Sequence, residues 1–125
     1  MYTHVMVGAN DLDQSRAFYD AVFGVLGINR VGDEEGRSFY ASETGAFGVT
    51  KPIDGAAASH ANGGTIGFGA ADKDQVDAWH AAGLAAGGSC DGAPGPRANA
   101  PGNAYGAYLR DPAGNKICVF CQLPA

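Results

Sequence analysis

The sequence lacks the long apolar segments of a membrane protein and the leader of a secreted one. No apolar run reaches the roughly 20 residues that a helix needs to span a bilayer. The N-terminus lacks the basic-then-apolar order of a signal peptide, because His4 and Asn10-Asp11 interrupt it. We therefore expect one soluble, cytoplasmic domain covering residues 1–125, with no membrane partner.

Basic residues and cysteines are both scarce. Eight Lys and Arg residues stand against 13 Asp and Glu residues, which gives a net charge of −5. Because nucleic-acid-binding domains usually carry a basic surface, we expect no nucleic-acid partner. The three cysteines are an odd number, which disfavours a disulfide framework. Cys118 and Cys121 form a C-x-x-C pattern, but strand residues three apart face opposite ways, which disfavours a thioredoxin-like redox site.

Several catalytic motifs are also missing. The sequence contains no phosphate-binding loop, no nucleophile elbow and no pair of catalytic carboxylates, and its glycine-rich segments do not match G-x-G-x-x-G after a strand. The 20 glycines fall largely in three loops, which indicates turns and lids rather than disorder. Function must therefore be inferred from the fold and from the residues that the fold brings together.

A hairpin near the C-terminus is the most clearly patterned part of the chain. Residues 105–110 and 117–121 are β-prone, and the turn 111–115 between them has the sequence D-P-A-G-N. Side chains alternate along a strand, so Cys118 faces one way with Lys116 and Phe120. Ile117, Val119 and Cys121 are expected to face the other way.

Two amphipathic helices are predicted at equivalent places in two halves of the chain. Asp11 and Gln14 form a capping box at the first helix, and Asp72 and Gln75 form one at the second. An offset of 61 residues superimposes the two boxes, which indicates an internal repeat. On the second helix, Trp79 is predicted to pack on the sheet, and its neighbour His80 to lie on the helix surface.

Short β-prone runs complete each half as strand, helix and three strands. The predicted strands are residues 2–7, 28–31, 37–42 and 46–51 in the first half, and 65–69, 89–90, 105–110 and 117–121 in the second. A small-residue connector covers residues 52–64, and residues 91–104 are predicted to form a flexible loop.

The predicted fold is α+β, with two βαβββ modules at about residues 1–53 and 64–125. They are expected to form a cupped, mostly antiparallel, mixed eight-stranded sheet with helices on its outer face and a ligand pocket on its concave face.

Two motifs give the chain a resemblance to a known family. H-V-x-V-x-x-x-D-L-x-x-S-x-x-F-Y, from His4 to Tyr19, and D-P-x-G-N-K-I, from Asp111 to Ile117, resemble the vicinal oxygen chelate superfamily. That superfamily includes glyoxalase I, extradiol dioxygenases and the fosfomycin and bleomycin resistance proteins. The resemblance covers nearly the whole chain and implies the fold, whereas one fold hosts many activities.

The resemblance implies four metal-ligand positions, on the first and last strands of each half. They correspond to His4, Thr65, Val49 or a neighbour, and Cys118. Only His4 is a ligand type that the family uses, and Cys118 would be a soft replacement. Catalytic metal sites generally need three protein ligands, and His60 would supply a third only if the connector folded inward. We expect no bound metal, with a divalent metal as the alternative.

Other polar and aromatic residues are candidates for ligand contact. Arg97, in the predicted loop, is placed to clamp a carboxylate or phosphate, although a solvated loop cation is the plainer interpretation. Some of the strand aromatics must line the concave face, and ordinary sheet packing explains the others. The predicted ligand-binding residues are His4, Tyr40, Thr65, Arg97, Tyr105, Tyr108 and Cys118.

Two functions remain open from the sequence. The first is a small-molecule-binding protein, forming a homodimer, that has lost most of the family's metal ligands. The alternative is a metal-dependent lyase or dioxygenase-like enzyme acting on a small oxygenated substrate. Whether the chain is an enzyme is left open, as are its ligand and its reaction.

Overall fold

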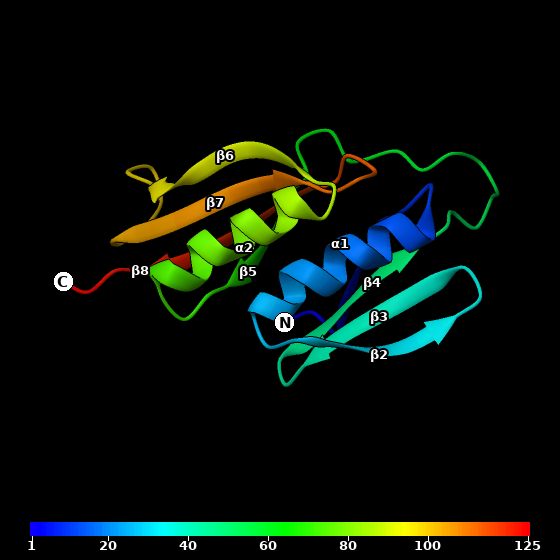
Figure 1. Cartoon of the computed structure of the whole chain (residues 1–125), viewed down its shortest axis with the longest axis horizontal. Helices are drawn as coiled ribbons and strands as arrows, with labels where there is room; N and C mark the ends of the chain where they lie inside the picture. The colour runs from blue at the N-terminus through cyan, green and yellow to red at the C-terminus, as the bar shows by residue number, and fades with distance from the viewer.

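The computed structural model describes all residues of the chain, Met1–Ala125, and shows the same order of elements twice (Figure 1). The first module contains β1 (His4–Gly8), α1 (Leu12–Val25), β2 (Asn29–Glu34), β3 (Arg37–Ser42) and β4 (Gly45–Thr50). The second contains β5 (Ile66–Gly69), α2 (Lys73–Ala85), β6 (Ser89–Pro96), β7 (Ala104–Arg110) and β8 (Lys116–Gln122). No helix is both long and apolar enough to cross a membrane.

Each helix begins at the aspartate that the sequence indicates. The Gln14 backbone N–H donates to Asp11 Oδ1 at 3.1 Å, and the Gln75 N–H donates to Asp72 Oδ1 at 2.9 Å. These side chains satisfy backbone donors that have no partner within the first helical turn. The two helices start 61 residues apart, as the internal repeat predicts.

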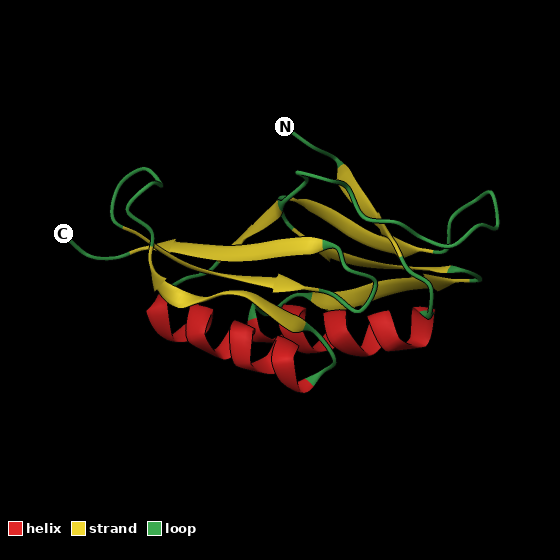
Figure 2. Cartoon of the chain, turned by 90° about the horizontal axis from the view of Figure 1, so that it is seen from above, coloured by secondary structure: helices red, strands yellow, loops and turns green.

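The strands form two separate hydrogen-bonded sheets. Their orders are β1-β4-β3-β2 and β5-β8-β7-β6. The first strand of each module pairs in parallel with the last, and the other pairings are antiparallel. The predicted α+β fold with two βαβββ modules is confirmed, but no ladder joins β1 to β5, so the eight strands divide into two sheets. Both helices lie on one side of the sheets, and the opposite side carries none (Figure 2).

The core lies between the helices and the sheets. Tyr19 and Phe23 of α1 pack on Tyr40 and Phe47, with ring centroids 4.9–6.2 Å apart. Trp79 of α2 is fully buried, as predicted. The β8 side chains also alternate as predicted, because Ile117, Val119 and Cys121 belong to this core whereas Cys118 and Phe120 do not.

The turn between β7 and β8 connects the second module to the first. The Asp111 carboxylate, 4% exposed, accepts hydrogen bonds from the Tyr19 hydroxyl at 2.6 Å and from the Asn115 side chain at 2.8 Å. Asn115 Nδ2 also donates to the Gly8 carbonyl at the end of β1. Burial and the Asp111 carboxylate raise the pKa of Tyr19 well above its usual value, because both disfavour a phenolate. The D-P-A-G-N motif is therefore a structural joint between modules.

Two local predictions are wrong. The segment 91–96 is part of β6 rather than a loop, because its backbone pairs with β7 through two register shifts that accommodate its glycines and prolines. His80 is buried rather than on the helix surface, being 8% exposed, and its Nε2 lies 3.2 Å from the Sγ of Cys90 on β6.

Candidate functional site

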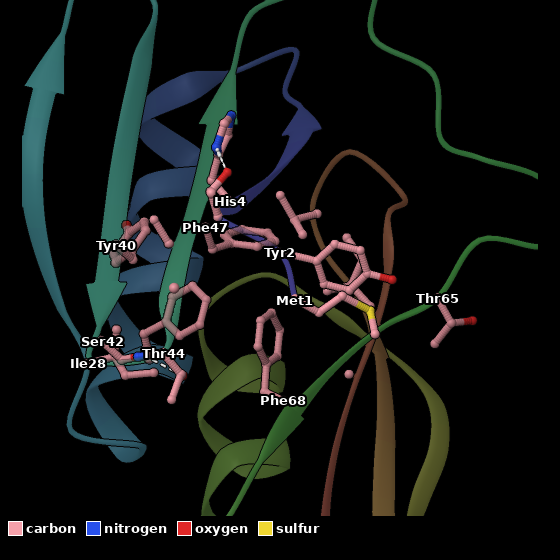
Figure 3. Close-up of a pocket in the computed structure, with 17 residues that line it drawn as sticks. Met1, Tyr2, His4, Ile28, Tyr40, Ser42, Thr44, Phe47, Thr65 and Phe68 are labelled. Carbon is pink, nitrogen blue, oxygen red and sulfur yellow. Dashed lines mark hydrogen bonds between the residues drawn. The ribbon is translucent and has the colours of Figure 1, made fainter.

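A cleft of about 610 Å³ opens where the two modules meet (Figure 3). It receives residues from the N-terminal segment and β1, from the β3–β4 hairpin, and from the start of β5. We call it the junction cleft, and its lining residues are Met1, Tyr2, Thr3, His4, Val5, Phe23, Ile28, Tyr40, Ser42, Thr44, Gly45, Ala46, Phe47, Thr65, Ile66, Gly67 and Phe68. Its volume is typical of a small-molecule site.

Aromatic rings from both modules form the wall of this cleft. The ring centroid of Phe68, on β5, lies 5.0 Å from that of Phe23 and 5.5 Å from that of Phe47. Both partners belong to the first module, and both contacts are edge-to-face. Such contacts favour planar apolar ligands, since one more ring extends the same packing. Sequence reasoning did not select Phe68, although the bulky residues that alternate with glycine along β5 are a signal that it packs on one face.

Tyr40 presents its ring rather than its hydroxyl to the cleft. The hydroxyl donates to Asp20 Oδ1 at 2.7 Å. Burial, and then this carboxylate, raise the pKa of Tyr40 above its usual value. Because its proton is already shared with Asp20, Tyr40 is better suited to packing than to proton transfer.

His4 and Thr65 are the main predicted polar residues that line the junction cleft. His4 is exposed, and its Nδ1 lies 2.8 Å from the Thr3 hydroxyl. In Figure 3 the imidazole rises away from the aromatic cluster, and the Thr65 side chain points away from His4. The two first-strand positions therefore do not converge on one point within the chain.

The donor set does not fit a catalytic metal ion. Val49 is fully buried on the helix side of its sheet. Its neighbour Gly48 faces the open side, but a side chain there would overlap Met6 Sδ and lie 3.0 Å from Phe39 Cε1. No group of three His, Cys, Asp or Glu side chains is placed to hold a metal. If the modules of two chains paired with each other, the number of candidate metal ligands would not change, because the four family ligand positions would still carry the same residues.

Cys118 lies on β8 of the second module, and His60, in the connector, lies beside the same module. Cys118 pairs in register with Gly67 of β5, and burial raises the pKa of its thiol, which disfavours the thiolate that binds metals. The His60 ring lies against the β7–β8 turn, where a Cβ added to Gly114 would come within 2.8 Å of its Nδ1. His60 therefore packs on the turn instead of completing a ligand set with His4.

The remaining predicted binding residues lie on or beside the second sheet, outside the junction cleft. Tyr108 is on the helix-free face, with Arg97 Cζ 5.6 Å and Lys116 Nζ 5.1 Å from its ring centroid. Arg97 donates to three backbone carbonyls of its own segment. Tyr105 faces α2 instead, and its hydroxyl donates to Asp77 Oδ1 at 2.6 Å.

The structure thus separates the seven predicted residues into two groups. Those that line the junction cleft are His4, Tyr40 and Thr65. Those that do not are Arg97, Tyr105, Tyr108 and Cys118. Their roles in binding stay predictions.

A profile of the Glyoxalase/Bleomycin resistance protein/Dioxygenase superfamily matches residues 2–119. The chain belongs to this superfamily. The resemblance inferred from His4–Tyr19 and Asp111–Ile117 is thereby confirmed, and superfamily members share the paired βαβββ architecture described above.

Solved structures support the same assignment. A glyoxalase/bleomycin resistance protein from Albidiferax ferrireducens T118 is 51% identical to the chain, with 99% of each chain covered and a TM-score of 0.90. A lactoylglutathione lyase from Agrobacterium tumefaciens is 26% identical, with 96% of this chain and 92% of that chain covered and a TM-score of 0.68. A glyoxalase-related enzyme from Fulvimarina pelagi shares the fold at 18% identity and a TM-score of 0.78. No curated protein matches the chain.

Proposed function

We propose that this superfamily member binds a small planar, largely apolar molecule in the junction cleft without using a metal ion. The observation that carries the proposal is the aromatic wall built by Phe23, Phe47 and Phe68 across the two modules. Ten of the 17 lining residues are hydrophobic, and His4 is the lining residue with an exposed ionisable imidazole. This composition resembles ligand pockets, which are mostly apolar with a few polar groups that fix orientation.

The proposal is tested with metal-free protein and a panel of one-ring and fused-ring aromatic compounds. Binding is screened by thermal shift, and the affinities of the compounds that bind are measured by calorimetry. Phe68→Ala is expected to weaken binding by about tenfold, which corresponds to about 1.4 kcal/mol, because it removes one face of the wall.

Phe120→Ala is the matched control. Phe120 lies on the second sheet against Tyr108, outside the junction cleft, and its removal is expected to leave the affinity unchanged. The opposite pattern, with binding lost in Phe120→Ala and kept in Phe68→Ala, would move the ligand to the helix-free face and contradict the proposal.

The alternative is a metal-dependent lyase or dioxygenase-like enzyme. It is favoured by the retention of His4 at a family ligand position and by the 26% identity to a lactoylglutathione lyase. This alternative predicts stoichiometric divalent metal and its loss in His4→Ala. The two-donor set of His4 and Cys118 counts against it, since catalytic sites generally use three protein ligands.

We also propose a homodimer in which the second copy helps to enclose the junction cleft. β1 pairs only with β4, and β5 pairs only with β8, so each has one unpaired edge at the module junction. The helix-free face also carries apolar side chains, among them Met6 and Phe39. Sedimentation equilibrium is expected to give twice the chain mass, and Phe39→Asp to lower it. Leu84→Asp, on an exposed part of α2, is expected to remain dimeric.

A further inference from the structure

A histidine and a cysteine form a close pair on the second module, remote from the junction cleft. His80 of α2 places Nε2 3.2 Å from the Sγ of Cys90 on β6. Neither residue lines the cleft, and β6 is the outermost strand of its sheet. A nucleophile within hydrogen-bonding reach of a base is the arrangement that activates thiols.

The two partners differ in their exposure in a way that suits a reactive thiol. Cys90 is an exposed residue on the outermost strand of its sheet. His80 is more than nine-tenths buried, and its only side-chain hydrogen bond is to Cys90. A buried imidazole directed at the sulfur of one exposed residue is thus available to take that thiol's proton.

The surroundings of His80 keep its imidazole neutral. Burial lowers its pKa below the usual value, and the Asp77 carboxylate, one turn earlier on α2, opposes this only in part. Asp77 is itself engaged by the Tyr105 hydroxyl and by Lys73. A neutral ring accepts the thiol proton, whereas a protonated one has no free acceptor.

The other charged groups near this strand are paired with one another. Asp91 lies at a register shift of β6, and its carboxylate accepts from Arg110 at 3.1 Å and lies 3.5 Å from Lys116 Nζ. These ion pairs leave Asp77 as the charged group that acts on His80.

The other two cysteines provide an internal contrast. Cys118 and Cys121 are both buried, and burial raises the pKa of each thiol. Neither has a histidine partner. The chain therefore holds one thiol on an exposed residue next to a histidine, and two buried thiols without one.

We propose that Cys90 is a modification site that forms mixed disulfides with low-molecular-weight disulfides such as glutathione disulfide, with His80 as the proton acceptor. As the Cys90 sulfur attacks one sulfur of the disulfide, the S–H proton passes to His80 Nε2. The new S–S bond forms as the disulfide bond breaks, and the leaving thiolate departs with that electron pair and takes up a proton. One thiol is consumed and one is released, so no further oxidant is needed.

The first test measures modification of the native chain by glutathione disulfide, resolved by residue with mass spectrometry of peptides. Cys90 is expected to react first, and at pH 7 to react faster than the same cysteine in urea-denatured chain, where His80 no longer assists. Modification led by Cys118 or Cys121, or a native Cys90 rate no higher than the denatured rate, would overturn the proposal.

The second test asks whether His80 acts as the base. His80→Gln is expected to slow Cys90 modification about tenfold at pH 7 and to give a rate that rises about tenfold per pH unit below roughly pH 8.5, as for an unassisted thiol. The wild-type rate is expected to depend on pH much less steeply between pH 6.5 and 8. Identical rates and pH profiles would refute the role of His80. Cys121→Ser is the control and should keep the wild-type rate at Cys90.

Discussion

The two modules have the same order of elements, but the hairpin that ends each module closes in a different way. In the first module β3 and β4 are joined through Glu43 and Thr44, which are exposed. In the second, β7 and β8 are joined by the turn 111–115, whose buried Asp111 reaches Tyr19 of the first module. The β3–β4 turn of the first module only connects two strands. The corresponding β7–β8 turn of the second module also joins that module to the first. The D-P-A-G-N motif therefore contributes to assembly of the fold rather than to chemistry in the junction cleft.

The helix-free faces of the two modules differ as well. In the first, Met6 and Phe39 lie against Gly48, and Arg37 Cζ lies 5.7 Å from the Phe39 ring centroid. In the second, Tyr108 is flanked by Arg97 and Lys116. The duplicated framework thus carries an aromatic cleft at its junction, and the cations differ between modules: two flank the Tyr108 ring of the second, and one, Arg37, lies over Phe39 of the first.

The largest expected effect on stability comes from a substitution that breaks the joint between the modules. Asp111→Ala removes the acceptor for the Tyr19 hydroxyl, the Asn115 side chain and two backbone N–H groups, and leaves them without this partner in a buried place. We expect a loss of about 3 kcal/mol or more in the free energy of unfolding, measured with urea. Glu43→Ala, in the corresponding turn of the first module, should change it by less than about 0.5 kcal/mol.

Removal of the other side of the joint should have a smaller effect that depends on pH. Tyr19→Phe is expected to cost about 2 kcal/mol at pH 7, since a hydrogen bond to a carboxylate is lost. The pKa of Tyr19 is raised in the folded state, so its contribution to stability is complete below about pH 10 and declines as the pH rises above the unfolded value. Urea unfolding between pH 8 and 11 should therefore show a shallower alkaline decline in Tyr19→Phe. Tyr2→Phe, which changes an exposed residue, should keep the wild-type decline.

Much of the fold could be predicted because local signals repeat. Three local signals predict structure directly: the aspartate caps predict the helix starts, the 61-residue offset predicts the repeat, and the D-P-A-G-N sequence predicts a turn. The extension of β6 could not be predicted, because the sequence D-G-A-P-G-P lacks β-forming residues and pairs only because β7 is present beside it. The burial of His80 was missed because it depends on how α2 packs against β6 and β7, which the sequence pattern of the helix does not show. The junction cleft could be predicted only in part, since Phe68 meets Phe23 and Phe47 through contacts between modules.

A glycine pair tests how closely the two helices pack. A Cβ at Gly83 of α2 would overlap Leu109 Cδ1 and lie 3.1 Å from Val22 Cγ1 of α1. Gly83→Ala is therefore expected to destabilise the protein by about 1–2 kcal/mol, with overpacking exceeding the gain in helix propensity. Gly24 of α1 has nothing within 4 Å, so Gly24→Ala should stabilise by up to about 1 kcal/mol. If urea unfolding showed that both variants change the free energy of unfolding in the same direction, this account of the helix interface would be contradicted.

The smallest effect is expected on the surface of α2. Lys73 Nζ lies 3.0 Å from Asp77 Oδ2, and both side chains are about half exposed. Lys73→Met should change the free energy of unfolding by less than about 0.5 kcal/mol, and 1 M salt should abolish the difference. A loss above 1 kcal/mol would mean that Asp77 needs Lys73 to hold Tyr105, and would give this pair a larger role than its exposure indicates.

The central claim is that the junction cleft works without a metal ion, and metal content tests it most directly. Untagged protein purified without chelators is analysed for nickel, zinc, manganese and iron, as wild type and His4→Ala, before and after titration with each metal. The account predicts far less than one metal per chain in both proteins and no saturable uptake. One metal per chain or per dimer in wild type, lost in His4→Ala, would contradict it and would favour the metal-dependent enzyme.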